Sequence, residues 1–592
     1  MKLIILLLIA LSSFSRLQSQ GIGIGTNSPD ASAALDITAT SKGLLIPRMT
    51  TAAISSISNP AKGLMLYDSV KNFLLVNMGT AAVPDWEPVV AGSGWSLAGN
   101  KATNPAINFI GTTDSVPLLF RINNHWAGFM DSVTGNTFLG YSAGQYTPGQ
   151  IASTAFGYQA LDSNKSGGEN TAFGVQTMSG PKFPGTPPVN NNTTAIGYQA
   201  LNKYWGNDCT AIGYQAFFSA GSDGGGFSTT ATGYQAEFRG GVQNTATGAF
   251  ALYSPQSVSG TSGSNCTANG VRALYNNSRF DNSPGIQGGD YNTATGFEAL
   301  YDNVAGIGNT ACGYQALYKN YYGNYNAGFG IGAMYSNSVH ASGNTAMGVY
   351  SLISTTNSQE NTAVGYDAGH SYDNGNYNCF IGAETDANGP GYTNSIAIGH
   401  GTLVTGSNMM RVGNGATVSI GGPVGWSTIS DGRVKRNIQE NVPGLAFINK
   451  LKPISYTIDL AAIDRITQPA AQKQQAVTLN AGSGKNETAS RPGPSQMTAA
   501  RSAKEQIVYT GFVAQQVEQA AQSLHYAFSG VDAARNDKDL YSLRYDEFVA
   551  PLTKAVQELA ALHDQLKKQN EQLVKEKEKA LQELDELEKK LN

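Results

Sequence analysis

The residues with the clearest potential for chemistry are Ser430 and Lys435, which flank the turn-forming pair Asp431-Gly432. A serine hydroxyl becomes a nucleophile when a base takes its proton, and a lysine can be that base when burial or a neighbouring cation lowers its pKa. Residues five apart face different sides of a regular helix and opposite sides of a regular strand. A Ser430/Lys435 dyad therefore requires a turn between its members, and Asp431-Gly432 predicts one.

The segment around this pair resembles the start of the peptidase S74 domain, an intramolecular chaperone first recognised on phage tail spikes and endosialidases. The sequence SDGRVKRNI from Ser430 to Ile438 fits the pattern S-D-x-R-x-K-x-N-I, and the blocks LKPISYTI, GFVAQQVEQ and YDEFVAPLTKAVQEL follow it. By this resemblance Ser430 is the nucleophile and Lys435 the general base of a single self-cleavage, while Asp431 and Arg433 hold the catalytic turn. The cut would release the chaperone once the trimer has folded. An ordinary polar turn in an uncut domain is the alternative.

The elements that precede this site are copies of a repeat of about 17 residues, written N-T-A-φ-G-Y-x-A. A short T-A-φ-G strand, a turn and a second short segment predict one coil of a β-solenoid. Small Ala and Gly residues let neighbouring coils approach, and we expect Tyr and Ile to supply the apolar area. The longer intervals contain polar insertions, which belong on loops of one face. A core this thin favours several chains packing together, and a trimer is expected. The central glycines are Gly140, Gly157, Gly174, Gly197, Gly213, Gly233, Gly248, Gly270, Gly296, Gly313, Gly330, Gly348, Gly365, Gly382 and Gly399.

These coils, over residues 136–402, resemble the head repeats of trimeric autotransporter adhesins. The resemblance implies a left-handed parallel β-roll wound as a trimer. We do not expect the four-stranded outer-membrane anchor of that family here, and surface attachment by that route is not implied.

The C-terminal part divides further. Residues 403–429 are interpreted as a β-rich neck and residues 430–551 as the chaperone domain, with a flexible insertion at 464–504 that is rich in Gln, Ala, Ser, Thr and Pro. Residues 552–592 repeat every seven positions, with one core position occupied by Leu552, Leu559, Leu566, Leu573, Ala580 and Leu587. Six heptads predict a coiled coil, and a parallel three-stranded bundle would gather the chains before their coils wind.

The N-terminal part begins with a basic residue, an apolar run and a small polar stretch, so residues 1–20 are interpreted as a secretory signal peptide. Residues 21–135 are expected to be β-rich and resemble the leader region of secreted tail-fibre-like proteins. An exposed tryptophan among Trp86, Trp95 and Trp126 could bind carbohydrate, although a core position is the more frequent role.

Composition excludes several classes of function. Between Asn136 and Thr428 only 22 of 293 residues are charged, whereas the last 42 residues contain 17, so two physically different segments share the chain. A net charge of −4 gives no reason to expect nucleic acid as a partner. The four cysteines, Cys209, Cys266, Cys312 and Cys379, have no metal-site spacing and fall inside the repeats, where they are expected to be small packed residues. No cofactor and no metal is expected.

The sequence thus predicts a mainly β protein: a trimeric β-roll of about 17-residue coils, then a small α+β chaperone domain that ends in a C-terminal coiled coil. We expect a secreted, extracellular or cell-surface homotrimer without a transmembrane anchor in the mature chain. It would be a fibre or adhesin with a cell-surface or carbohydrate ligand, and the alternative is a passive spacer with an uncleaved trimerisation domain. An enzyme that acts on an external substrate is disfavoured, because no catalytic set stands out in the repeats.

Overall fold

A computed structural model describes residues 21–89, 99, 104, 106, 108–146, 149–164, 166–180, 190–203, 206–220, 227–255, 263–277, 289–337, 340–370, 375–467, 478–479, 487–488 and 498–592. The chain forms two units, residues 1–111 and 112–592. The expected signal peptide, Trp95 and most of the expected insertion lie outside the described residues.

The first unit contains small β elements around a modest core. Strands β1 (Ile22–Ile24) and β2 (Leu35–Ile37) pair in parallel. A four-stranded sheet has the order β3 (Arg48–Met49), β4 (Met65–Asp68), β5 (Phe73–Asn77), β6 (Trp86–Pro88), with helix α2 (Thr51–Ser55) beside it. Its core is Ile54, Leu66 and Leu75, against which the half-buried Trp86 packs. Trp86 is therefore a core residue.

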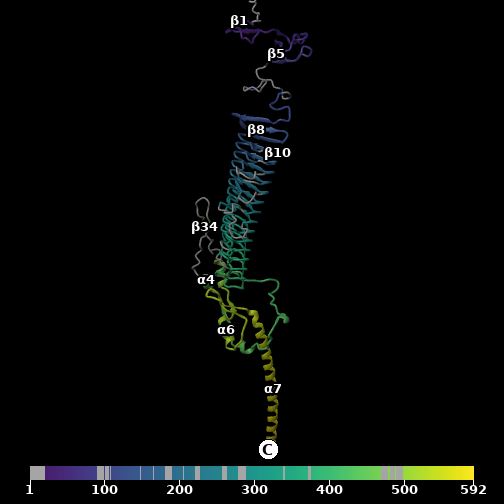
Figure 1. Cartoon of the computed structure of the whole chain (residues 1–592). Helices are drawn as coiled ribbons and strands as arrows, with labels where there is room; N and C mark the ends of the chain where they lie inside the picture. The colour runs from purple at the N-terminus through teal and green to yellow at the C-terminus, as the bar shows by residue number, and fades with distance from the viewer. Residues whose placement is uncertain are drawn as a thin grey trace, which may run out of the picture. The chain divides into compact units, whose positions relative to one another are not determined.

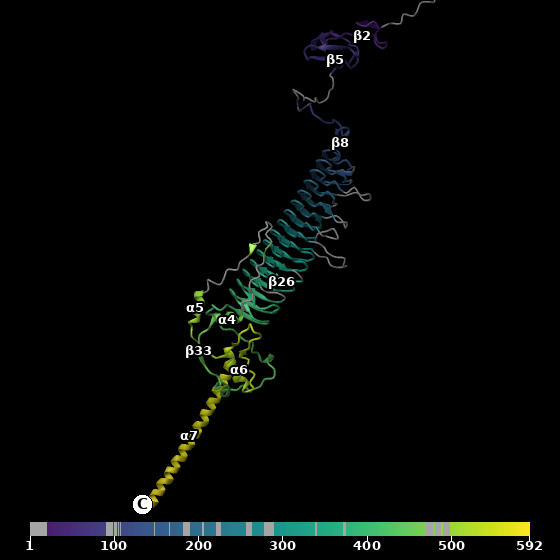
Figure 2. The same ribbon diagram turned by 90° about the vertical axis from the view of Figure 1, so that its left-hand side faces the viewer.

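The second unit is dominated by the solenoid, whose rungs are stacked in Figure 2. The hairpin β7 (Leu118–Ile122) and β8 (His125–Asp131) leads antiparallel into β9, and from there each strand pairs in parallel with the strand one coil further along. The register joins equivalent residues, as in Ala294 with Ala311. The predicted β-solenoid of about 17-residue coils is confirmed. The rungs are β9 (Asn136–Leu139), β11 (Thr154–Phe156), β13 (Thr171–Phe173), β14 (Thr194–Ile196), β15 (Thr210–Ile212), β17 (Thr230–Thr232), β19 (Thr245–Thr247), β20 (Thr267–Asn269), β21 (Thr293–Thr295), β22 (Thr310–Cys312), β23 (Ala327–Phe329), β25 (Thr345–Met347), β27 (Thr362–Val364), β28 (Cys379–Ile381), β30 (Ile396–Ile398) and β32 (Met410–Val412).

A second set of short parallel pairs closes other sides of the coils. These are β10 (Gly149–Ile151) with β12 (Ser166–Gly168), β16 (Ser219–Ala220) with β18 (Arg239–Gly240), β24 (Ser336–Asn337) with β26 (Ser354–Thr355), and β29 (Asp386–Ala387) with β31 (Leu403–Val404). Because β31 and β32 continue the ladder, the solenoid extends into residues 403–429, the range that the sequence predicts as a β-rich neck.

The interior of the coils differs from the expectation that Tyr and Ile would supply its apolar area. In the coil that begins at Thr310, the fully buried apolar residues are Ala311, Ala316 and Leu317, while Cys312 is exposed. The residue after the strand alanine and the Tyr after the glycine point outward in most coils. The physical reason is the pleat: with Ala inside, both of its strand neighbours must face out.

Buried asparagines connect successive coils through hydrogen bonds. The Nδ2 of Asn309 donates to Asn292 Oδ1 at 3.2 Å and to Gly323 O at 2.8 Å, and the Asn309 backbone N–H donates to the same Asn292 Oδ1 at 2.9 Å. Asn326, Asn344, Asn361 and Asn378 continue this ladder. Buried amides with every partner made contribute about 1 kcal/mol per hydrogen bond and hold one register.

The central glycine is required by backbone geometry. Gly313 has φ +140°, and a Cβ there would lie 2.5 Å from the carbonyl oxygen of Gly330 in the next coil. Only glycine permits both this backbone conformation and this close approach of coils.

After the solenoid the chain forms a small domain, in which β33 (Ile454–Tyr456) pairs antiparallel with β36 (Tyr509–Gly511) and β37 (Val531–Asp532) with β38 (Ser542–Leu543). The pair β34 (Thr478–Leu479) and β35 (Glu487–Thr488) lies in sequence between helices α4 (Leu460–Thr467) and α5 (Thr498–Glu505). The helices of the small domain are η1 (Gly432–Val434), α3 (Leu445–Ile448), α4 (Leu460–Thr467), α5 (Thr498–Glu505), α6 (Ala514–Gln522), η3 (Tyr545–Phe548) and α7 (Val549–Leu591).

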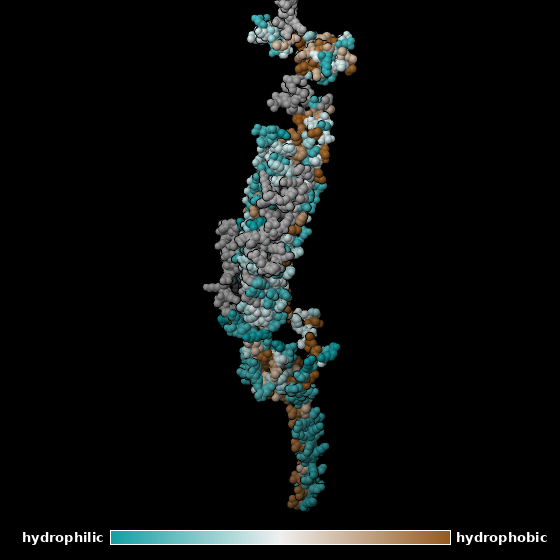
Figure 3. Space-filling model, viewed as in Figure 1, coloured by the Kyte–Doolittle hydropathy of each residue, from teal (hydrophilic) through white to brown (hydrophobic). Residues whose placement is uncertain are grey.

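Helix α7 is a single 43-residue helix that begins three residues before the expected coiled-coil boundary at 552. Its side chains from Val556 onward are exposed except Glu558, which is half-buried, and apolar side chains gather along one side of it in Figure 3. The leucines of the heptads therefore have no partner among the described residues, as expected for one strand of a coiled coil. No described helix is both long enough and apolar enough to cross a membrane.

Candidate functional site

Ser430 lies on residues 413–444, which join the last solenoid strand to α3 and are exposed over most of their length. This segment is defined here as the tether. It is drawn in green beside the end of the solenoid in Figure 1. Residues 418–430 are all exposed and contain no helix or strand. The site is therefore positioned by a local turn and not by a rigid element.

The turn is built by Asp431. Its side chain accepts a hydrogen bond from the Arg433 backbone N–H at 2.9 Å and thereby caps the short helix η1. The same carboxylate accepts hydrogen bonds from Arg433 Nε and Nη2. The hydrogen bonds from Arg433 hold the pKa of Asp431 below its ordinary value. Asp431 and Arg433 thus hold each other and fix the turn, although both are too exposed for the pair to add much stability.

This turn brings Ser430 and Lys435 together. Lys435 Nζ donates a hydrogen bond to Ser430 Oγ at 2.8 Å. That distance is within the reach required between a nucleophile and the base that takes its proton. The geometry permits proton transfer from the hydroxyl to a neutral lysine amine.

The tether exposes more apolar area than a linker normally does. Trp426 and Ile429 are 84% and 86% exposed, and Val424, Val434 and Ile438 are also largely exposed. Large apolar side chains in such a run usually mark a surface that another molecule covers. Covering this segment would also remove water from Ser430 and Lys435, which lie within it.

The three sequence blocks that follow the tether meet in one small core. The block LKPISYTI supplies β33, which pairs with β36 at the start of the second block. The core includes Phe447 of α3, Val517 of α6 and Phe548 of η3. Phe512 stacks on Phe548 with ring centroids 5.5 Å apart. Leu445 N–H donates to Glu558 Oε2 at 2.8 Å, which ties α3 to α7. The domain therefore links the base of the long helix to the segment that contains Ser430.

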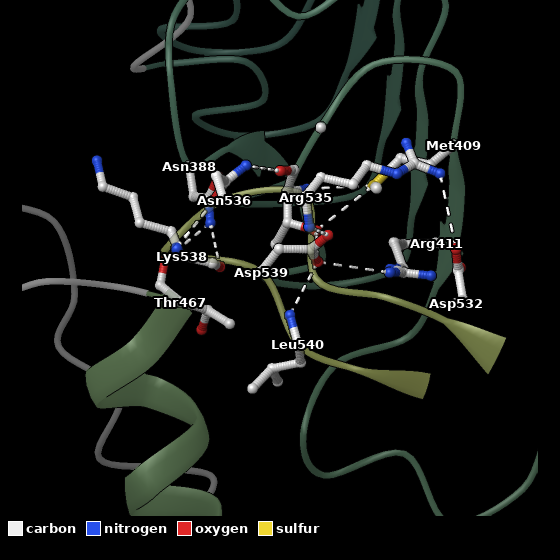
Figure 4. Close-up of polar contacts among 12 residues, drawn as sticks. Asn388, Met409, Arg411, Thr467, Asp532, Arg535, Asn536, Lys538, Asp539 and Leu540 are labelled. Atoms are coloured by element: carbon white, nitrogen blue, oxygen red, sulfur yellow. Dashed lines mark hydrogen bonds and ion pairs between the residues drawn. The ribbon is translucent and has the colours of Figure 1, made fainter. Parts of the chain in front are cut away.

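The domain also contacts the end of the solenoid, at the site shown in Figure 4. Thr405 Oγ1 donates to Asp539 Oδ1 at 2.6 Å, and Asn536 Nδ2 donates to Thr405 O at 2.9 Å. Asn388 Nδ2 donates to the carbonyl oxygens of Thr467 and Lys538. We name this set of contacts the solenoid cap. It satisfies polar groups of the last coils, where the next rung is missing.

Asp539 is the centre of the solenoid cap. Burial tends to raise its pKa, but hydrogen bonds from Thr405 and from the backbone of Arg535 and Leu540, with the charge of Arg411, outweigh burial and lower the pKa overall. Arg411 Nη2 lies 3.9 Å from Asp539 Oδ1. The solenoid cap is therefore centred on a carboxylate that stays charged at neutral pH.

No sequence motif predicts the solenoid cap. Its one sequence signal is the polar run RNDKDL at 535–540, which marks a loop but does not indicate a partner 130 residues away. The expected insertion at 464–504 is also shorter than predicted among the described residues: Asp464 lies in α4 and pairs with Arg501 of α5. The amphipathic ends of the insertion fold because they contact each other.

The other candidate residues have structural roles. Trp126 is half-buried and donates from Nε1 to Ala143 O at 2.8 Å. Cys209 and Cys266 are buried, but Cys312 is exposed and Cys379 partly so, which corrects the expectation that all four are packed. None of the four forms a disulfide. Among the described residues, no three His, Cys, Asp or Glu side chains are grouped to hold a metal ion.

Residues 23–103 match the family described as phage tail like trimerisation region. None of the curated proteins matches this chain. The matched residues belong mainly to the first unit, at the opposite end of the sequence from the heptads of α7. This match and the β-solenoid together fit a trimeric, tail-fibre-like protein.

Proposed function

We propose that this protein is a secreted, homotrimeric fibre whose C-terminal domain assembles the trimer and then cuts itself free through Ser430 and Lys435. The observation that supports the cut is the Lys435 Nζ to Ser430 Oγ distance of 2.8 Å on a turn held by Asp431 and Arg433. The observation that supports assembly is the unpartnered apolar side of α7.

Each chemical step can be stated for these residues. Neutral Lys435 takes the proton of Ser430, and Ser430 Oγ attacks the carbonyl carbon of a neighbouring peptide bond. The carbon–nitrogen bond breaks, the protonated lysine supplies a proton to the leaving amine, and an ester to Ser430 remains. Water then hydrolyses the ester and restores the hydroxyl.

Assembly would control when this chemistry occurs. A lysine acts as a base only where burial or a nearby cation disfavours its charged form. The turn is exposed in the single chain. Neighbouring chains could cover the apolar side chains of the tether. Ser430 and Lys435 would then be shielded from water only in the assembled trimer.

The order of the elements supports a chaperone role for the domain. A solenoid of small coils gains stability only when neighbouring coils stack, so its first contacts are costly. The solenoid cap places the domain against the last coils, and α7 would hold three such ends together. Winding would then proceed from an organised end.

The test compares the wild-type chain with Ser430→Ala and Lys435→Ala, and Ser427→Ala serves as a matched control on the same tether. Denaturing gels and intact-mass measurement should show two fragments, divided beside Ser430, for the wild type and for Ser427→Ala. Both site variants should stay whole. A wild-type trimer that stays whole, or a Ser430→Ala variant that is cut, would overturn the self-cleavage.

A further inference from the structure

One face of the solenoid keeps a constant length in every coil. From the strand Thr to the turn residue after the second Ala, the repeat T-A-φ-G-Y-x-A-x has no insertion in any of the fifteen coils. Length varies only afterwards: equivalent strand threonines are 16 residues apart between Thr194 and Thr210 but 26 apart between Thr267 and Thr293. All insertions therefore leave from the other sides of the coil.

The same face is free of charge. We define it by three positions in each coil: three before, one before and one after the central glycine. None of these positions is Asp, Glu, Lys or Arg in any of the fifteen coils. The next position along the chain, two after the central glycine, does contain charged residues: Arg272 is partly exposed there, and Glu298 and Asp367 are buried. The charge-free strip is therefore bounded, and it runs along the whole ladder.

Apolar side chains on this strip are half-exposed in the single chain. Phe173 is 54% exposed, and Ile196, Phe329 and Ile381 are about 40% exposed. The tyrosines beside them stack along the ladder, with 5.1 Å between the ring centroids of Tyr214 and Tyr234. Exposed apolar side chains gathered along one uncharged strip are characteristic of a surface that another molecule covers.

We propose that this strip, named the insertion-free face, is where the solenoids of the three copies pack together. The inference rests on the proposed trimer and adds the surface that forms it. A second copy is favoured over a ligand because both ends of the chain carry trimerising elements, the matched region at residues 23–103 and the heptads of α7. Copies that are joined at both ends lie parallel and in register. A face without insertions in fifteen coils can then pack against the same face of another copy along its whole length.

The proposal places Cys312 at the interface. It occupies the position before Gly313 and is exposed in the single chain. Around a three-fold axis the three copies of Cys312 come to one level and face each other. By contrast, Tyr325 of the same coil lies outside the face and is 71% exposed.

The experiment uses the full chain with Cys379→Thr, which restores the residue that most coils have at that position. Cys209 and Cys266 are buried, so Cys312 is then the accessible thiol. A short tris-maleimide at low protein concentration should join Cys312 into a covalent trimer on denaturing gels. The matched control has Cys312→Ser and Tyr325→Cys, and it should react with a monofunctional maleimide but should not be joined.

The oligomeric mass, measured on the same samples, tests the proposed trimer separately from the proposed packing surface. A trimer in which the Tyr325→Cys thiols are joined and the Cys312 thiols are not would overturn the insertion-free face while leaving the trimer intact. A chain that is monomeric by mass would overturn the proposed function itself. A trimer whose Cys312 reacts freely with the monofunctional reagent and is never joined would assign the face to a ligand.

Discussion

Glu237 offers a sharp test of the coil interior, because it occupies a position that is Leu in most coils. Its side chain is fully buried, and Oε1 accepts hydrogen bonds from Gly241 N–H at 3.0 Å and Asn244 Nδ2 at 2.8 Å. Oε2 has no hydrogen-bond partner among the described residues. Burial raises the pKa of Glu237 to about 8, so the folded coil favours the protonated acid.

The size and sign of the effect follow from linkage. The folded pKa lies above the ordinary value of 4.5, so the stabilisation is full below pH 4.5 and is lost as the pH rises through about 8. At about 1.4 kcal/mol per pKa unit, the coil loses up to roughly 5 kcal/mol over that range. The Glu237→Gln variant keeps the acceptor oxygen and does not titrate. Its stability should therefore be independent of pH over the same range.

Hydrogen exchange can follow this one coil, because solenoid stability is local. After correction for intrinsic exchange rates, protection of the Glu237 amide should fall between pH 5 and pH 9 in the wild type and stay level in Glu237→Gln. The Leu317 amide, which donates to Ala333 O at the equivalent position of another coil, is the internal reference. Equal pH dependence in both proteins would refute the burial of Glu237 and with it the assignment of inward positions.

Two further predictions concern the ladder and its cap. Gly313→Ala should lower the melting temperature strongly or prevent folding, since the strained φ costs about 1–3 kcal/mol before the clash with Gly330 is counted. Gly421→Ala, where a Cβ meets nothing within 4 Å, should leave the circular dichroism melt unchanged, and equal melts for the two variants would contradict the account. Asp539→Ala should raise hydrogen exchange at residues 403–407 at neutral pH, whereas the exposed Asp537→Ala should not. In the wild type the cap should hold above pH 3.8 and weaken as the pH falls through the lowered pKa of Asp539, and a cap unaffected by acid would count against this role.

The repeat was predictable because parallel pairing in register couples residues one coil apart, so each coil must repeat the same types of residue. The direction of each side chain was harder to predict. A three-residue strand shows too little alternation to reveal that Ala311 faces in and Cys312 faces out. The residues after the strand alanines are often apolar, which suggests wrongly that they face the interior. The proposed packing of three copies along the insertion-free face would account for these outward apolar residues.

The candidate site divides in the same way. The turn at Asp431-Gly432 and the approach of Lys435 to Ser430 depend on neighbours in sequence, and local chemistry indicates them. The solenoid cap joins Thr405 to Asp539, 134 residues apart, and the sequence around either residue does not predict contact with the other. Such contacts arise from the packing of whole elements.

The central claim is that three copies of this chain form one fibre. Light scattering coupled to size-exclusion chromatography measures it directly on the purified protein. We predict a mass three times that of whichever chain or fragment carries the solenoid, where the 592 residues together have a mass of 62.2 kDa before any segment is removed. A single-copy mass for that fragment at micromolar concentration would contradict the account.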